Sequence, residues 1–313
     1  ISESTRQDAI ERLGIPGDRI VTINGGISDF FKPVEDREGW KEALRRKFDI
    51  QTSRFVLYTG GDEFRKNLPG AIQAFAALPD HLRSDCTLVI VCNFADGRRE
   101  IFRDIARREG LQDSQICLPG YVTNEELVAF YSVCDLFFFP SNYEGLGLPV
   151  LEAMACGAPV IGANNSSIAE IIQKPDALFN ERDPKDVARV MSGVLSEPGM
   201  AQSLRDHGRQ RTRAYTWRES ANTALEAMEE AKARKQIHGR HAIASGWLPK
   251  LRVAIHGPVL PDRSGIADYA AQLLPFLSRY NQIDLFHERE DEVEVGVEGV
   301  AAYHHREFPE RAD

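Results

Sequence analysis

The sequence predicts an α/β fold in which a parallel β-sheet carries helices on both faces, followed by a partial second βαβ unit. From Arg19 to about Gly193, apolar runs of four to six residues alternate with helical stretches of ten to fifteen. This alternation is typical of repeated βα units, which build parallel sheets. A new strand, helix and strand pattern begins at Leu251, after a polar stretch.

Apolar runs predict the strands of the first sheet, and two of them include the loop that follows the strand. These segments lie at residues 55–61, 87–92, 115–122, 136–139 and 159–162. Helices are expected at residues 68–78 and 166–170, and after the glycine turn at 145–147. In the second unit, strands at 251–258 and 281–288 flank a helix at 267–279.

Two glutamates flank a glycine turn that follows the apolar run at 136–139. Glu144 precedes Gly145, Leu146 and Gly147, and Glu152 falls in the helix that this turn opens. A strand, a tight turn and a helix N-terminus form an anion site, because the free N–H groups of the first helical turn point at the ligand. Carboxylates facing phosphate would repel it, so we expect both to accept hydrogen bonds from hydroxyls on either side. A diphosphate with a ribose on one side and a sugar on the other is a nucleotide sugar, and this is the ligand that the segment predicts.

A second motif predicts a pyrophosphate clamp. The run at 55–61 ends in Gly60 and Gly61, and Arg65 and Lys66 follow shortly before a helix. Arginine offers a planar fork of donors and lysine a point charge, and both suit a diphosphate. The alternative is that both cations are solvated at a helix start, where positive charge is slightly unfavourable without an anion.

These motifs together resemble the donor-site signature of retaining family 4 (group 1) glycosyltransferases of the GT-B architecture. The resemblance rests on Glu-x7-Glu, on Gly-Leu-Gly-Leu-Pro inside it, and on Ala-Cys-Gly-Ala-Pro-Val-Ile behind it. It implies a Rossmann-like C-terminal domain in which Glu144 holds sugar hydroxyls and Glu152 holds the ribose. The base is expected near Tyr121 and Val122, where backbone groups would contact it.

The resemblance also implies the reaction. A hexose, with mannose favoured, would pass from a nucleoside-diphosphate sugar to a glycan or lipid-linked acceptor in surface polysaccharide biosynthesis, with retention. GDP-mannose is favoured over a UDP-sugar, because the Arg-Lys-Asn variant resembles bacterial mannosyltransferases. The expected catalytic residues are Glu144, Arg65 and Lys66, and no metal or cofactor beyond the substrate is expected. In the family a basic residue often follows the first glycine, where this chain has Gly61, so Arg65 and Lys66 are expected to share that charge.

Two other functions remain open at this point. One is a non-catalytic module that binds nucleotide sugars, and the other is an epimerase on the same fold. An epimerase would need catalytic acids from two domains and would usually lack the combination of Gly-Leu-Gly-Leu-Pro with Arg-Lys-Asn. A phosphorylase would need a lysine placed for pyridoxal phosphate, and no pattern here indicates one.

The predicted domain organisation is uneven. Residues 1–233 are expected to form the donor-binding domain, with a crossover segment at 1–31, followed by a polar linker at 234–250. Residues 251–313 resemble the start of a second GT-B N-terminal domain, in which Gly265 is either a phosphate-contacting glycine or an ordinary loop glycine. We therefore expect part of a tandem enzyme whose upstream N-terminal domain is missing, so that the chain binds donor but transfers poorly. A circularly permuted enzyme is the alternative.

Composition and charge indicate which classes of partner the chain is expected to bind. The net charge of −9 argues against nucleic acid. Basic clusters at 45–47, 98–99 and 107–108 leave peripheral association with the inner face of a membrane open, although cytoplasmic localisation is expected. No apolar run approaches the 18 residues of a membrane span. The cysteines form no Cys-x-x-Cys pair, which favours free thiols over a metal site.

Overall fold

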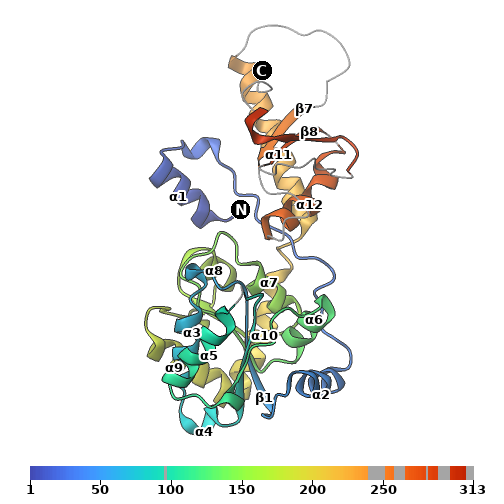
Figure 1. The fold of residues 1–313 in the computed structure, drawn as a ribbon. Helices are drawn as coiled ribbons and strands as arrows, with labels where there is room; N and C mark the ends of the chain where they lie inside the picture. The colour runs from blue at the N-terminus through green and yellow to red at the C-terminus, as the bar shows by residue number, and fades with distance from the viewer. Residues whose placement is uncertain (95–96, 239–250, 257–264, 280, 288–296, 308–313) are drawn as a thin grey trace. The chain divides into compact units, whose positions relative to one another are not determined.

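The computed structural model describes residues 1–313 except 95–96, 239–250, 257–264, 280, 288–296 and 308–313. The chain divides into two compact units, and Figure 1 labels their helices and some of their strands. The first unit contains residues 1–22 and 27–214, and the second contains residues 23–26 and 215–313.

A six-stranded parallel sheet forms the centre of the first unit, in the order β3-β2-β1-β4-β5-β6. Its strands are β1 (Arg54–Thr59), β2 (Cys86–Val91), β3 (Ile116–Cys117), β4 (Leu136–Phe139), β5 (Val160–Ala163) and β6 (Leu178–Phe179). Every residue of β2 and β4 is buried, as expected for strands covered on both faces. The predicted α/β fold with a parallel sheet is confirmed, whereas the short strand β6 was not predicted.

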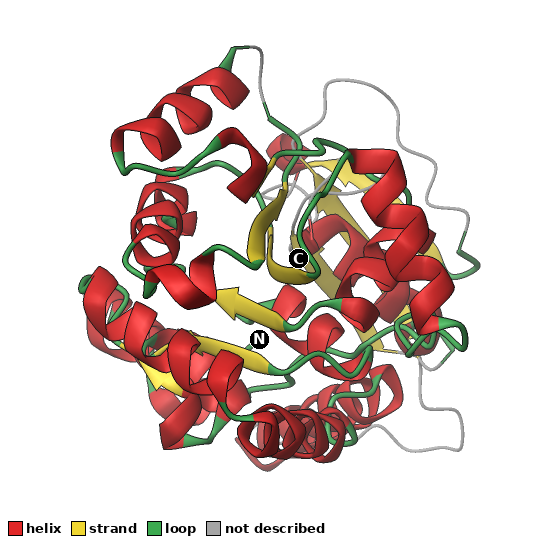
Figure 2. Cartoon of the chain, turned by 90° about the horizontal axis from the view of Figure 1, so that it is seen from below, coloured by secondary structure: helices red, strands yellow, loops and turns green. Residues whose placement is uncertain are grey.

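Helices cover both faces of this sheet (Figure 2). In one layer α3 packs against α5 and α9, and in the other α6 packs against α2 and α7. The helices are α1 (Glu3–Leu13), α2 (Arg37–Phe48), α3 (Leu68–Ala76), α4 (Asp80–Arg83), α5 (Arg98–Arg108), α6 (Asn124–Val133), α7 (Leu148–Ala155), α8 (Ser166–Ile172), α9 (Pro184–Ser196) and α10 (Pro198–Thr212). Short 3-10 turns are η1 (Gly17–Arg19), η2 (Phe64–Lys66), η3 (Asp113–Gln115) and η4 (Pro175–Ala177).

Local sequence sets where the helices nearest the site begin. The helix α6 starts with a reciprocal capping box, in which Thr123 and Glu126 each satisfy the other's backbone N–H. The helix α7 follows Gly147, whose φ of 79° is left-handed and therefore favours glycine, and Pro149 lies in its first turn. These two starts bring α6 and α7 to the same edge of the sheet.

The second unit contains a three-stranded parallel sheet in the order β7-β8-β9. Its elements are α11 (Trp217–His238), β7 (Leu251–His256), α12 (Gly265–Leu277), β8 (Asn281–His287), β9 (Val300–His304) and η5 (His305–Glu307). The predicted second parallel sheet is confirmed, and β9 extends it beyond the prediction. The loop before Gly265 lies outside the described residues, so the role of that glycine stays a prediction.

The core of the second unit includes a helix that the sequence assigns to the first domain. Ala221 and Ala224 of α11 are buried in one cluster with Leu273, Leu277 and Ile283, which come from α12 and β8. Helix α11 also continues to His238, past the predicted start of the linker, and residues 239–250 lie outside the described part of the chain. The domain boundaries at 233 and 250 therefore stay predictions.

Candidate functional site

The candidate site lies where the connections of the first sheet change direction. From β1 the chain continues outward to β2 and β3, and from β4 it continues outward to β5 and β6 on the other side. The strands β1 and β4 are neighbours and parallel, so their carboxyl ends open at the same edge. In open α/β sheets, ligands bind in the crevice at this switch point. Both predicted motifs follow these two strands.

The structure brings Glu144, Arg65 and Lys66 together in one cluster. The Nζ of Lys66 lies 2.7 Å from one carboxylate oxygen of Glu144, and an Nη of Arg65 lies 2.7 Å from the other. Glu144 and Lys66 are buried, with side chains 7% and 9% exposed, whereas the Arg65 side chain is 48% exposed. The Lys66 ammonium also lies 5.2 Å from the ring centre of Phe139. Without ligand, both predicted phosphate cations thus contact the glutamate predicted to hold the sugar.

Backbone contacts fix the two strand-end segments to each other. The carbonyl of Arg65 accepts hydrogen bonds from Asn142 N at 2.7 Å and from Ser141 Oγ at 2.8 Å. Asn67 Nδ2 donates to the carbonyl of Pro140 at 3.0 Å. These bonds place η2 beside the segment after β4, so the proximity of Lys66 to Glu144 is built into the backbone.

The glycine turn leaves the start of α7 open. Gly147 is the N-cap residue, and no side chain caps the helix there. Within the first turn, Pro149 has no N–H and the Val150 N–H bonds to the Gly147 carbonyl at 3.0 Å. The N–H groups expected to face an anion are therefore those of Leu148 and of the turn at 145–147. Leu146 is buried, and the carbonyl of Gly145 accepts a hydrogen bond from Thr5 Oγ1 at 3.2 Å, so α1 holds the turn from outside.

Glu152 has a different partner from Glu144. One of its carboxylate oxygens lies 3.0 Å from the hydroxyl of Tyr131, which in turn lies 2.7 Å from Thr59 Oγ1. Burial raises the pKa of Tyr131 well above the usual value for tyrosine, and the charge of Glu152 raises it further. The phenol therefore stays protonated and donates to the carboxylate.

The remaining predicted residues lie on neighbouring loops. A Cβ at Gly60 would meet the Tyr58 hydroxyl at 2.8 Å, so the backbone there has no room for a larger residue, and Gly61 accepts a hydrogen bond from that hydroxyl. After β3, Tyr121 is 71% exposed while Val122 is buried. The base and phosphate contacts stay predictions.

Sequence reasoning missed a group of serines around Glu144. Ser141 Oγ lies 2.7 Å from its carboxylate, Ser166 Oγ accepts from its backbone N–H at 3.0 Å, and Ser167 Oγ donates to its carbonyl at 2.9 Å. The available signal was the polar run at 164–167, directly after a buried strand next to β4. By itself, that run predicts only the start of a helix.

The described residues contain no group of three or more His, Cys, Asp or Glu side chains placed to hold a metal ion. Burial raises the pKa of Cys86 to about 11 and that of Cys92 to about 12, so these thiols are largely protonated at neutral pH. Within the same described part of the chain, no helix is long and apolar enough to cross a membrane.

Sequence comparison places this site in a known group of proteins. The family described as "Glycosyl transferases group 1" matches residues 41–211. The serotype-specific mannosyltransferase WbdA of Escherichia coli is 34% identical over 227 residues, which cover 72% of this chain and 28% of that protein. The O-antigen chain mannosyltransferase B of Escherichia coli is 31% identical over 221 residues, covering 71% of this chain and 52% of that protein. The chain thus spans about a quarter of the length of the first relative and about half of the length of the second.

Solved structures share the fold. A glycosyltransferase from Rickettsia africae ESF-5 superposes with a TM-score of 0.62 at 18% identity, covering 77% of this chain and 63% of that one. WaaG, a glycosyltransferase involved in lipopolysaccharide biosynthesis, superposes with a TM-score of 0.59 at 19% identity, covering 71% of this chain and 61% of that one. At these identities the likeness concerns the fold, and it agrees with the GT-B arrangement expected from the sequence.

Proposed function

Because the chain belongs to the glycosyl transferases group 1 family, we propose that its first unit binds a nucleoside-diphosphate sugar and that the whole protein transfers the hexose to a glycan or lipid-linked acceptor. One observation carries this proposal. The cluster of Lys66, Arg65 and Glu144 lies at the switch point of the sheet, beside the glycine turn that leads to the start of α7, which no side chain caps. Cations and free N–H groups suit a diphosphate, and the carboxylate suits sugar hydroxyls.

The proposed reaction uses this cluster to stabilise the leaving group. As the glycosidic bond breaks, negative charge builds on the β-phosphate, and preorganised donors around it lower the barrier. Lys66 and Arg65 would turn part of their hydrogen bonding from Glu144 to that phosphate. Glu144 would then accept hydrogen bonds from the sugar, and Glu152 from the ribose. Retention at the anomeric carbon is part of the proposal.

We further propose GDP-mannose as the donor and surface polysaccharide as the product class. The support is the naming of the two Escherichia coli relatives as mannosyltransferases, one of them for O-antigen chains. Peripheral membrane association stays a prediction. In each of the three basic clusters an arginine lies beside an acid: Arg45 lies 3.7 Å from Glu42, Arg107 lies 3.3 Å from Asp104, and Arg98 is paired with Asp62.

Calorimetric titration of the chain with GDP, UDP, GDP-mannose and UDP-glucose tests the binding proposal. We expect both diphosphates to bind, the guanine nucleotides more tightly. If no nucleoside diphosphate binds, the proposed donor site is wrong. A second assay measures mannose transfer by the full-length protein to a mannose-terminated acceptor. Donor binding without hydrolysis or transfer by the full-length protein would favour a non-catalytic binding module.

A further inference from the structure

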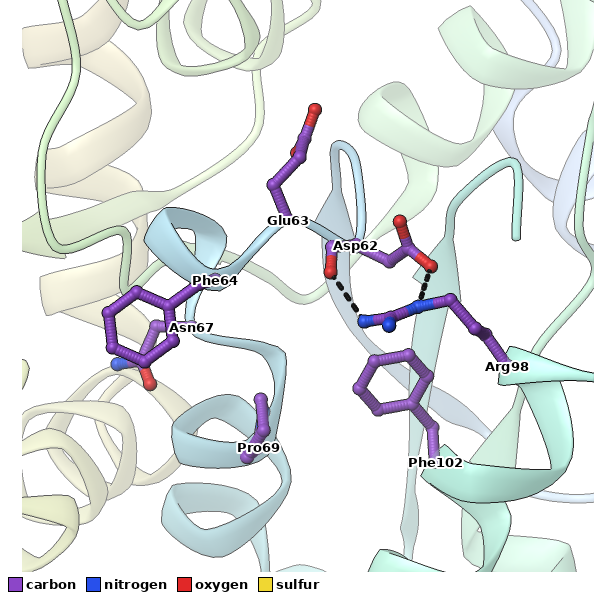
Figure 3. A pocket seen from close by; sticks show the side chains of 7 residues that line it. All are labelled: Asp62, Glu63, Phe64, Asn67, Pro69, Arg98 and Phe102. Carbon is purple, nitrogen blue, oxygen red and sulfur yellow. Dashed lines mark hydrogen bonds and ion pairs between the residues drawn. The ribbon is translucent and has the colours of Figure 1, made fainter. Parts of the chain in front are cut away.

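An open slot lies beside the candidate donor site (Figure 3). It lies among η2, the start of α3 and the start of α5, and its volume is about 500 Å³. Figure 3 shows the rings of Phe64 and Phe102 on either side, with Pro69 between them. The full lining consists of Asp62, Glu63, Phe64, Asn67, Pro69, Arg98 and Phe102.

The apolar walls of the slot differ in exposure. Phe102 is 3% exposed, and the Arg98 guanidinium lies 5.7 Å from the centre of its ring. Phe64 is 94% exposed, although it is large and apolar and belongs to the same short turn as Arg65 and Lys66. Its exposed ring adds little to the packing of the first unit. A flat, solvated ring beside an apolar wall suits a ligand with one apolar face.

The charges at the rim indicate a neutral ligand. The Asp62 carboxylate is paired with Arg98, and the Asp62 carbonyl accepts a second hydrogen bond from the same guanidinium at 2.9 Å. Glu63 adds a further carboxylate, which points away from the rings in Figure 3. The net negative charge disfavours phosphate and other anions. Hydroxyl groups both donate and accept, so they suit a rim that offers carboxylates and a guanidinium together.

We propose that this slot binds one sugar residue of a neutral acceptor glycan, a site that rests on the proposed transfer function. The C–H face of a pyranose would lie against Phe64, and its hydroxyls would bond to Asp62 and Arg98. A 3-10 helix rises about 2.0 Å per residue, so the backbone of Phe64 lies about 4 Å along the axis from that of Lys66. A glycan held there has its chain beside the diphosphate end of the donor, where transfer takes place.

Saturation-transfer NMR with α-linked mannotriose tests this site in the presence of saturating GDP. In Phe64→Ala we expect the affinity for mannotriose to fall at least fivefold, while the affinity for GDP stays within about twofold. Phe64→Trp should keep mannotriose binding, because the flat ring is retained. Phe30→Ala is the matched control, since Phe30 is another exposed phenylalanine of the first unit outside the slot.

Each result decides for or against the proposal. If the wild type binds GDP but not mannotriose, or if Phe64→Ala binds mannotriose as the wild type does, the slot is not a glycan site. A loss of GDP affinity alone would assign the slot to the donor, and a loss of self-association in Phe64→Ala would assign it to a contact between chains. Both outcomes overturn the proposal. Failure of GDP to bind at all would instead contradict the proposed function.

Discussion

The two glutamates of the candidate site flank one glycine turn, yet they lie in different electrostatic surroundings. Glu144 is buried and contacts two cations, while Glu152 accepts a hydrogen bond from the neutral phenol of Tyr131. Removal of the Glu144 carboxylate would leave the buried ammonium of Lys66 without its ion-pair partner, and an unpaired charge is costly in a protein interior. Identical side chains in one motif thus differ in how far ligand binding and stability depend on them.

The largest expected effect concerns the contribution of the Glu144 carboxylate to the stability of the fold. Glu144→Ala removes the anion from buried Lys66, and breaking such a pair by removing one partner costs about 3 to 5 kcal/mol of unfolding free energy. Urea denaturation followed by circular dichroism measures the loss. Glu42→Ala is the matched control, because Glu42 also lies between two arginines, Arg45 and Arg46, but is exposed. Its loss should stay within about 1 kcal/mol. Equal losses of unfolding free energy in Glu144→Ala and Glu42→Ala would contradict the special role of the buried ion pair.

The next effect concerns the binding of a diphosphate by Arg65 and Lys66. The double variant Arg65→Ala with Lys66→Ala should bind GDP about a hundredfold more weakly, since charge-assisted hydrogen bonds contribute about 1.5 to 3 kcal/mol each. GMP, which lacks the β-phosphate, should lose much less. Calorimetry with both nucleotides measures the difference. Arg45→Ala with Arg46→Ala removes two consecutive cations outside the site, the first partly buried and the second exposed, and serves as the control. An equal loss for GMP and GDP would indicate a general electrostatic or folding effect.

A smaller effect separates the two glutamates by ligand. Glu152→Gln should weaken GDP and GDP-mannose alike, about tenfold, because it removes the charge from one hydrogen bond to the ribose. Glu144→Gln should weaken GDP-mannose only. It should leave GDP binding unchanged or stronger, because the diphosphate no longer competes with a carboxylate for the two cations. Paired titrations of both ligands test this, and equal losses for both ligands in both variants would contradict the assigned roles.

The smallest expected effect concerns the hydrogen bond between the Tyr131 hydroxyl and Glu152. Tyr131→Phe removes the hydroxyl between Thr59 and Glu152, and we expect it to cost about 1 kcal/mol of unfolding free energy. Since the pKa of Tyr131 is raised by burial, the phenol stays protonated and this cost should persist as the pH rises to 10. Tyr143→Phe removes an exposed phenol that also bonds a carboxylate, that of Asp8, and should cost less. A cost for Tyr131→Phe that vanishes below pH 10 would contradict the assigned protonation.

Most of the sheet could be predicted because its strands are uniformly apolar and bounded by glycine or polar loops. The glycine turn at 145–147 and the helix that carries Glu152 followed from local chemistry in the same way. The contact between Lys66 and Glu144 could not, because it depends on β1 and β4 being neighbours, and strand order is a property of the whole fold. Tyr131 was missed for a related reason, since a tyrosine inside an apolar helix looks like core until its partner is known.

The two-residue strand β6 escaped prediction because it is too short to show an apolar run of four or more residues. The strand β9 does begin with such a run, at 300–303, but no strand was predicted after the one at 281–288. The serines around Glu144 were visible as a polar run, but only their positions in space connect them with its carboxylate and backbone. Sequence therefore predicts which segments carry the chemistry better than it predicts which side chains meet there.

The contact between Gly26 and Trp217 has a consequence for modularity. A Cβ on Gly26 would lie 2.3 Å from the backbone nitrogen of Trp217, so the chain touches itself there with no room for a side chain. The intervening segment, 27–214, carries the whole six-stranded sheet and begins and ends close to this one point. Segments whose ends lie close together are suited to excision and transplantation. A protein engineer could therefore move the six-stranded sheet between chains as one continuous segment, leaving Gly26 unchanged at the junction and supplying residues 1–22 separately, because they belong to the same compact unit.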